Sequence, residues 1–145
     1  MNVYENKIEL TELANKLFMY TDSRDWQKLI TEVFTATVLF DMSNAGGEAP
    51  KILPAKEICD MWQEGLKNMD AIHHQAGHYI IEVNGPGADI YGYAMAMHYK
   101  KTAIHGSSRL FVGTYNLKAV DTAVGWRLSA FKYNLKFIDG NTSME

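Results

Sequence analysis

The stretch that decides the fold is AIHHQAGHYIIEVNGPGADIYGYAMAMHYKK, residues 71–101. Two runs rich in apolar, β-branched and aromatic residues flank the turn sequence NGPG, which is the pattern of a β-hairpin. In the second run small residues alternate with bulky ones, so that one face carries Ala94, Ala96 and His98 and the other carries Tyr91, Tyr93, Met95, Met97 and Tyr99. This alternation predicts a strand that is covered on both faces.

The same strand-like pattern continues towards the C-terminus. RLFVGTYNLKAV (109–120) and WRLSAFKYNLKFI (126–138) follow a loop around HGSS and are separated by the turn DTAVG. Together with the first hairpin they predict four long antiparallel strands. Glycines within strands, such as Gly77, favour the bulges and bends that curl a sheet.

The first half of the chain is helical instead. Apolar residues recur at steps of three and four in IELTELANKLFMY (8–20), in RDWQKLITEVF (24–34) and in PAKEICDMWQEGLKNM (54–69). Between them TATVLFDM (35–42) reads as a strand, and the turn-rich SNAGGEAPKIL follows it. The sequence therefore predicts an α+β fold, with N-terminal helices packed on a highly curved antiparallel sheet that forms a cone-shaped cavity.

Composition excludes several classes of protein. A chain of 145 residues with 47% hydrophobic content indicates one domain over residues 1–145. The net charge of −3 argues against nucleic acid as a partner. No apolar stretch is long enough for a membrane span, and the N-terminus has no apolar signal core. The only cysteine, Cys59, excludes an intramolecular disulfide, so we expect a cytoplasmic protein.

Three of the five histidines lie between positions 73 and 78. On a helix, the spacing of His74 and His78 would present two ligands to one metal ion. In a strand, residues four apart are separated by about 13 Å, so we expect no metal here. Alternation sends His74 and His78 to one face and His73 to the other, although a register error of one residue would exchange His73 and His74. A histidine in a strand is also often only a hydrogen-bonded structural residue.

A resemblance to a known family suggests a functional role for one of these histidines. YTDSRDW (20–26), IHHQAG (72–77) and GTYNLKAVDTAVGWRLSAF (113–131) resemble the SnoaL-like branch of the nuclear transport factor 2-like superfamily. The resemblance covers nearly the whole chain. It implies the cone-shaped α+β fold, and it is compatible with polyketide cyclases, dehydratases, isomerases and non-catalytic binding domains.

Within this superfamily, scytalone dehydratase and similar enzymes pair an aspartate on a helix with a histidine on a strand. The resemblance carries these roles onto Asp22 and His74 as catalytic candidates, with His73 as a substitute for His74. An aspartate beside an imidazole fixes its tautomer and stabilises the imidazolium that forms when it takes a proton from carbon. The alternative for Asp22 is a helix cap, the role that we also expect for Asp25. No metal or organic cofactor is then expected.

Other polar side chains are candidates for secondary positions in the cavity. These are Tyr20 at the end of the first predicted helix, His98 on the second strand of the hairpin, and Tyr115 and Asn116 on the third long strand. Tyrosine hydroxyls would stabilise charge that develops on a carbonyl oxygen. Thr21 stands where the dehydratases have one of their tyrosines.

Two functions follow from these patterns. The first is a lyase or isomerase, of dehydratase or cyclase type, that abstracts a proton from a hydrophobic, carbonyl-bearing small molecule. The second is a non-catalytic module of the same fold that binds an apolar small molecule or serves in dimerisation. A direct hydrogen bond between Asp22 and His74 inside a pocket would favour the enzyme. For both functions we expect a homodimer, or a trimer. The bulky strand face around Met95 has a larger area than the predicted helices can cover.

Overall fold

The first helix begins at a capping box. In the computed structural model, which describes residues 2–145, the side chain of Asn2 accepts hydrogen bonds from the backbone N–H groups of Tyr4 and Glu5, and the Glu5 carboxylate accepts one from the N–H of Asn2. Helix α1 (Val3–Asp22) then places an apolar stripe against the sheet. Leu10 and Leu17 in this stripe are almost fully buried.

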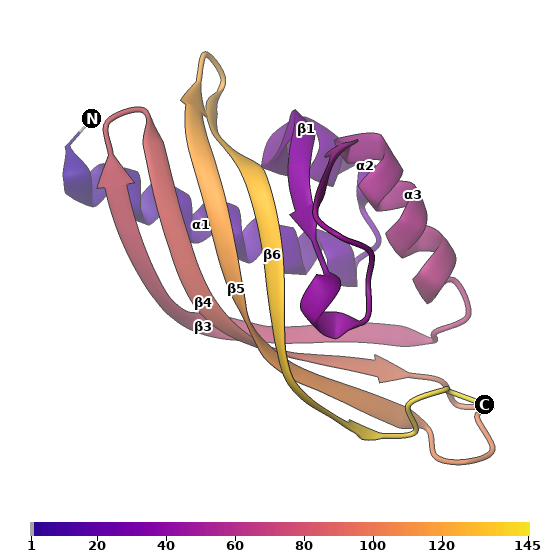
Figure 1. Ribbon diagram of the computed structural model, residues 1–145. Coiled ribbons are helices and arrows are strands. Elements are labelled where there is room, and N and C mark those ends of the chain that lie inside the picture. Colours follow the sequence, from indigo (N-terminus) through magenta and orange to yellow (C-terminus); the bar gives the residue numbers. More distant parts are fainter. Residues whose placement is uncertain (1) are drawn as a thin grey trace.

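The remaining elements follow the predicted order of helices first and long strands afterwards. The helical elements are α2 (Trp26–Lys28), the π-helix η1 (Leu29–Val33), the 3₁₀-helix η2 (Ser43–Ala45) and α3 (Ala55–Leu66). The strands are β1 (Phe34–Asp41), β2 (Lys51–Pro54), β3 (Ala71–Asn84), β4 (Gly87–Tyr99), β5 (Ser108–Thr122) and β6 (Gly125–Gly140). The predicted α+β class is thus confirmed. Figure 1 shows the long strands bending so that α1 and α3 lie on the concave side of the sheet.

Within residues 2–145 the sheet has six strands, in the order β2-β1-β6-β5-β4-β3. The four long strands β3 to β6 form the predicted antiparallel meander. The whole sheet is mixed rather than purely antiparallel, because β1 pairs with β6 in parallel. This pairing joins segments far apart in the chain, so the pattern within either strand gives no sign of its direction. The short strand β2, which pairs with β1, lies in a stretch that we expected to be only turns.

A β-bulge in β3 changes which residues face the helices. Gly77 pairs with Tyr93, but the next paired residue is Ile80, opposite Tyr91, so β3 carries one extra residue here. His78 adopts a φ of +54° within this bulge. Beyond it the alternation is shifted by one position.

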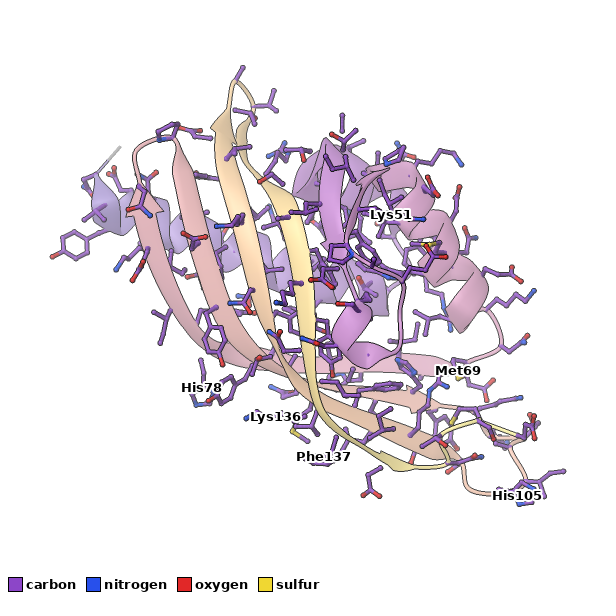
Figure 2. The ribbon with its side chains drawn as sticks, in the orientation of Figure 1. Lys51, Met69, His78, His105, Lys136 and Phe137 are labelled. Atoms are coloured by element: carbon purple, nitrogen blue, oxygen red, sulfur yellow. The ribbon has the colours of Figure 1, made fainter. Side chains whose placement is uncertain are left out.

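The shift corrects the expectation that His78 shares a face with His74. Tyr79 points inward and donates a hydrogen bond from its hydroxyl to Oδ1 of Asn15, at 3.0 Å. His78 is exposed, and its ring lies 5.7 Å from that of Tyr93 on the outer face of the sheet. Figure 2 shows it on the same side as Lys136, away from the helices.

Strand β4 shows the predicted alternation. Ala94, Ala96 and His98 are buried towards the helices, whereas Met95 and Met97 are 46% and 44% exposed on the outer face. The homodimer that we expect through this face stays a prediction. Within residues 2–145 no helix is long and apolar enough to cross a membrane.

Candidate active site

The last residue of α1 and a residue of β3 form a close polar pair. Nδ1 of His74 lies 2.6 Å from Oδ1 of Asp22, and the backbone N–H of His74 donates to Oδ2 of Asp22 at 2.9 Å. Both carboxylate oxygens are therefore engaged by one residue. Because a carboxylate only accepts hydrogen bonds, the proton of neutral His74 lies on Nδ1 and the lone pair on Nε2. The ring of Phe18 packs against this imidazole, with centroids 5.4 Å apart.

The two aspartates near the end of α1 have different roles. Asp22 does not cap a helix, because its carboxylate faces His74. Asp25 is the N-cap of α2, and its side chain accepts from the N–H of Lys28 at 3.2 Å. The side chain of Asp22 is 21% exposed and that of His74 is 11% exposed. The pair thus lies largely out of water.

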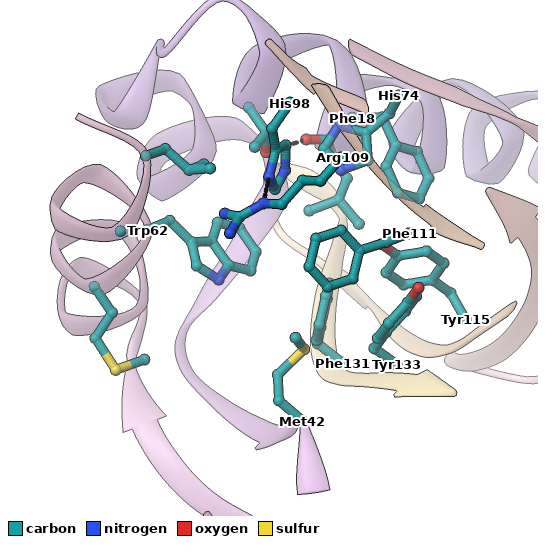
Figure 3. Close-up of a pocket in the computed structure, with 15 residues that line it drawn as sticks. Phe18, Met42, Trp62, His74, His98, Arg109, Phe111, Tyr115, Phe131 and Tyr133 are labelled. Carbon is teal, nitrogen blue, oxygen red and sulfur yellow. Dashed lines mark hydrogen bonds between the residues drawn. The ribbon is translucent and has the colours of Figure 1, made fainter. Parts of the chain in front are cut away.

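His74 lines a cavity of about 260 Å³ between the sheet and the helices (Figure 3). Asp22 lies behind His74 rather than in the cavity wall. The wall is mostly apolar and aromatic, and its members include Leu17, Phe18, Met42, Met61, Trp62, Leu66, Phe111 and Phe131. Such a wall suits a small, apolar ligand.

A second histidine in the same wall is held in the opposite tautomer. Nδ1 of His98 accepts a hydrogen bond from Nε–H of Arg109 at 2.9 Å, so neutral His98 carries its proton on Nε2. Burial lowers the pKa of His98 to about 4, and the positive charge of Arg109 acts in the same direction, while the charge of Asp22 opposes them. At neutral pH His98 is therefore uncharged and its ring presents an N–H donor, whereas the neutral form of His74 presents the lone pair of Nε2.

Two tyrosines from β5 and β6 complete the polar lining. Tyr115 and Tyr133 are opposite each other in the strand register, and their ring centroids are 4.8 Å apart. The hydroxyl of Tyr133 is buried and has no hydrogen-bond partner among residues 2–145. Burial raises the pKa of Tyr133 to about 12 and raises the pKa of Tyr115 further. Both phenols thus stay protonated at neutral pH and are available as donors.

The structure brings four of the predicted site residues together and separates three others from them. Asp22, His74, His98 and Tyr115 lie at or directly behind the cavity wall.

Three candidate residues lie away from the cavity. Tyr20 lies outside the wall, with the Lys28 ammonium 5.3 Å from its ring centroid. His73 is exposed on the outer face, because it alternates with His74 along β3. Asn116 alternates with Tyr115 in the same way, and its Oδ1 accepts from Nδ2 of Asn134 at 2.7 Å. The expectation that Tyr20 and Asn116 line the cavity is corrected, and His73 does not take the place of His74.

Sequence reasoning missed Arg109 and Tyr133. A signal for Arg109 was present, because residues 109, 111, 113 and 115 share a strand face with the predicted Tyr115. Tyr133 follows from Tyr115 only once the β5–β6 register is known. Among residues 2–145 no three His, Cys, Asp or Glu side chains are grouped to hold a metal ion.

The chain matches a known domain family. The sequence pattern of the SnoaL-like domain matches residues 4–132. Among curated proteins none matches the chain significantly.

Several solved structures share the fold along nearly the full length. The Kfla4162 protein from Kribbella flavida is 23% identical, with a TM-score of 0.92 over 99% of this chain and 98% of that one. A provisionally named scytalone dehydratase from Novosphingobium aromaticivorans is 10% identical, with a TM-score of 0.79 over 96% and 92%. Hexachlorocyclohexane dehydrochlorinase type 3 from Novosphingobium barchaimii is 11% identical, with a TM-score of 0.78 over 95% and 91%. At these identities the likeness shows the fold alone.

Proposed function

Because the chain belongs to the SnoaL-like domain family, whose fold occurs in dehydratases and dehydrochlorinases, we propose that it is a lyase or isomerase that removes a proton from carbon. The base is His74 and its positioning partner is Asp22. The substrate is a small hydrophobic molecule with a carbonyl group next to the acidic C–H bond.

The observation that carries this proposal is the double hydrogen bond between Asp22 and His74 beside an apolar cavity. The carboxylate holds the imidazole in one orientation and one tautomer, which leaves the Nε2 lone pair as the only basic site of the ring. Once Nε2 takes a proton, the adjacent carboxylate stabilises the imidazolium. A merely structural histidine needs only one hydrogen bond and no cavity beside it.

The first step transfers a proton from the carbon next to the carbonyl to Nε2 of His74. The electron pair of the C–H bond moves into a new C–C double bond, and that of the carbonyl moves to its oxygen, which becomes an enolate. The hydroxyl of Tyr133, the hydroxyl of Tyr115 and Nε2–H of His98 are donors for this oxygen. Such donors stabilise charge most strongly in a cavity that excludes water.

The enolate then has two outcomes. In an isomerisation, the imidazolium of His74 returns its proton to a different carbon. In an elimination, the enolate electrons return to form a double bond as a leaving group departs from the β-carbon, and the imidazolium protonates that group where it is a hydroxide. Both outcomes begin with the same proton transfer, so one test serves for both.

The test is hydrogen exchange of a probe ketone in D₂O, followed by proton NMR. 2-Tetralone is apolar and carries acidic C–H bonds beside its carbonyl. We expect the wild-type protein to exchange these protons faster than buffer does, and Asp22→Asn to lose most of the acceleration. If 2-tetralone binds in the cavity but exchanges at the buffer rate, the protein is better described as the non-catalytic binding module.

A further inference from the structure

Arg109 introduces a positive charge into an otherwise neutral and apolar part of the cavity wall. Its side chain is half-buried, and among residues 2–145 it forms no salt bridge. Burial disfavours the charged form of its guanidinium and so lowers the pKa of Arg109. A cation removed from water is costly unless an anion or several acceptors compensate it.

The contacts of Arg109 fix its orientation without neutralising it. Nε–H donates to Nδ1 of His98 at 2.9 Å, and Nη1 donates to the backbone carbonyl of Thr142 at 3.0 Å. Both acceptors are neutral. Its Cζ lies 5.4 Å from the ring centroid of Phe111, on the cavity wall (Figure 3). A guanidinium has five N–H donors, so three of them have no acceptor among the described residues.

Asp22, the carboxylate behind this wall, forms neither a hydrogen bond nor a salt bridge with Arg109. Its two oxygens accept instead from the ring and the backbone N–H of His74. Asp22 also lies behind His74, whereas Arg109 lines the cavity itself. The positive charge thus faces a space that the protein does not fill.

We propose that Arg109 binds a carboxylate group of the substrate. The inference rests on the proposed function and narrows its substrate class, from apolar carbonyl compounds in general to those that also carry an acid group. A carboxylate supplies two acceptor oxygens in one plane, which matches the fork of unused guanidinium N–H groups.

The arrangement also orients the substrate. Arg109 donates a hydrogen bond to His98, and both residues line the same cavity as His74. A carboxylate at Arg109 therefore anchors one end of the ligand at the His98 side of the wall. The aromatic rings of the wall hold the apolar body, and the acidic C–H bond is left to His74.

The test compares two probes that differ in charge but hardly in shape. 2-Naphthoate carries a carboxylate, and 2-naphthamide replaces it by a neutral amide. We expect the wild-type protein to bind 2-naphthoate about tenfold or more tightly than 2-naphthamide, measured by NMR titration, because charge-assisted hydrogen bonds are about twice as strong as neutral ones. The preference should disappear in Arg109→Gln, which keeps an N–H donor for His98.

Arg109→Lys is the matched second variant, because it keeps the charge and loses the planar fork. It should retain part of the preference for 2-naphthoate. Equal affinity of the wild type for both probes, absence of binding of 2-naphthoate, or an unchanged preference in Arg109→Gln would overturn the proposal.

Asp22→Asn separates this proposal from the proposed function. It should keep the preference for 2-naphthoate while it loses exchange of 2-tetralone. A protein that prefers 2-naphthoate but never exchanges 2-tetralone has the anion site without the proposed chemistry. A protein that exchanges 2-tetralone without preferring 2-naphthoate has the chemistry without the anion site.

Discussion

Asp22 and His74 are 52 residues apart in the chain, yet the carboxylate of one accepts both the ring and the backbone N–H groups of the other, at 2.6 and 2.9 Å. The backbone bond ties the carboxylate to the strand itself, so the ring bond does not depend on a flexible side chain alone. This geometry fixes a single tautomer of His74.

The first prediction concerns that tautomer. In Asp22→Asn the amide can donate as well as accept, so Nδ1 of His74 no longer has to carry the proton. We expect the exchange of 2-tetralone to fall about 10²- to 10⁴-fold, because the general base His74 is no longer held in its active tautomer. Nitrogen-15 NMR of the imidazoles should show the Nδ1–H tautomer of His74 in the wild type and a mixture in the variant.

Asp25→Asn is the control for this change. It makes the same chemical substitution three residues away, at the N-cap of α2 and outside the cavity wall. Asparagine is as good an N-cap as aspartate, so stability and exchange should both stay near wild type. If the two variants lose exchange equally, Asp22 has no special role.

The second prediction concerns the pH dependence of stability. Burial lowers the pKa of His98 to about 4 in the folded protein, whereas an unfolded chain titrates near the ordinary value of 6.5. Between these values the unfolded state binds the extra proton, so stability falls as pH falls from 6.5 to 4. The loss at pH 4 is about 3 kcal/mol for this group. Urea unfolding at several pH values measures it.

His98→Gln should flatten this dependence, since glutamine does not titrate. The variant is expected to be less stable at pH 7, but its stability should fall less between pH 6.5 and 4. His73→Gln is the control, because His73 is exposed on the outer face of β3. A wild-type slope in His98→Gln, or a flattened one in His73→Gln, would show that His98 is not the group responsible.

The alternation in β4 was enough to predict from the sequence that His98 and Met95 lie on opposite faces of the strand. Period-two patterning works there because β4 carries no extra residue: the bulge in its pairing with β3 lies in β3, and its pairing with β5 is regular. It fails in β3, where His78 takes a positive φ that favours glycine, although Gly77 precedes it. No spacing rule identifies which of these two residues forms the bulge.

The pair of Asp22 and His74 was reached through family resemblance, because the path of α1 across the sheet is a tertiary property. The positions of Arg109 and Tyr133 depend on strand register. Arg109 lies opposite His98, and Tyr133 lies opposite Tyr115. Register in turn depends on bulges such as the one between Val112 and Gly113 in the β5–β6 pairing, which the sequence pattern leaves open.

The third prediction concerns association. Tyr93, Met95 and Met97 form an exposed row on the outer face of β4, each between 44% and 46% exposed. We expect this row to pair with a second copy of the chain, and Met95→Glu to convert the dimer into a monomer in analytical ultracentrifugation. Ile104→Glu is the control, because Ile104 is 86% exposed in the loop that follows β4 and does not belong to the row. A monomeric wild type, or equal dissociation by both variants, would contradict the prediction.

The last prediction separates stability from activity at Tyr133. Its buried hydroxyl has no partner in the protein, so Tyr133→Phe removes a desolvated group and should leave stability unchanged or raise it by about 1 kcal/mol. Exchange of 2-tetralone should nevertheless fall about 10- to 100-fold, because a donor to the enolate is lost.

Tyr79→Phe is the matched control, since the Tyr79 hydroxyl donates to Asn15 at 3.0 Å outside the cavity wall. That variant should lose about 1 kcal/mol of stability and keep its exchange rate. The two substitutions are chemically identical, so their effects can be compared directly. If Tyr133→Phe loses exchange while Tyr79→Phe loses stability, the Tyr133 hydroxyl acts on the substrate. If both variants lose stability and exchange alike, the Tyr133 hydroxyl only supports the fold.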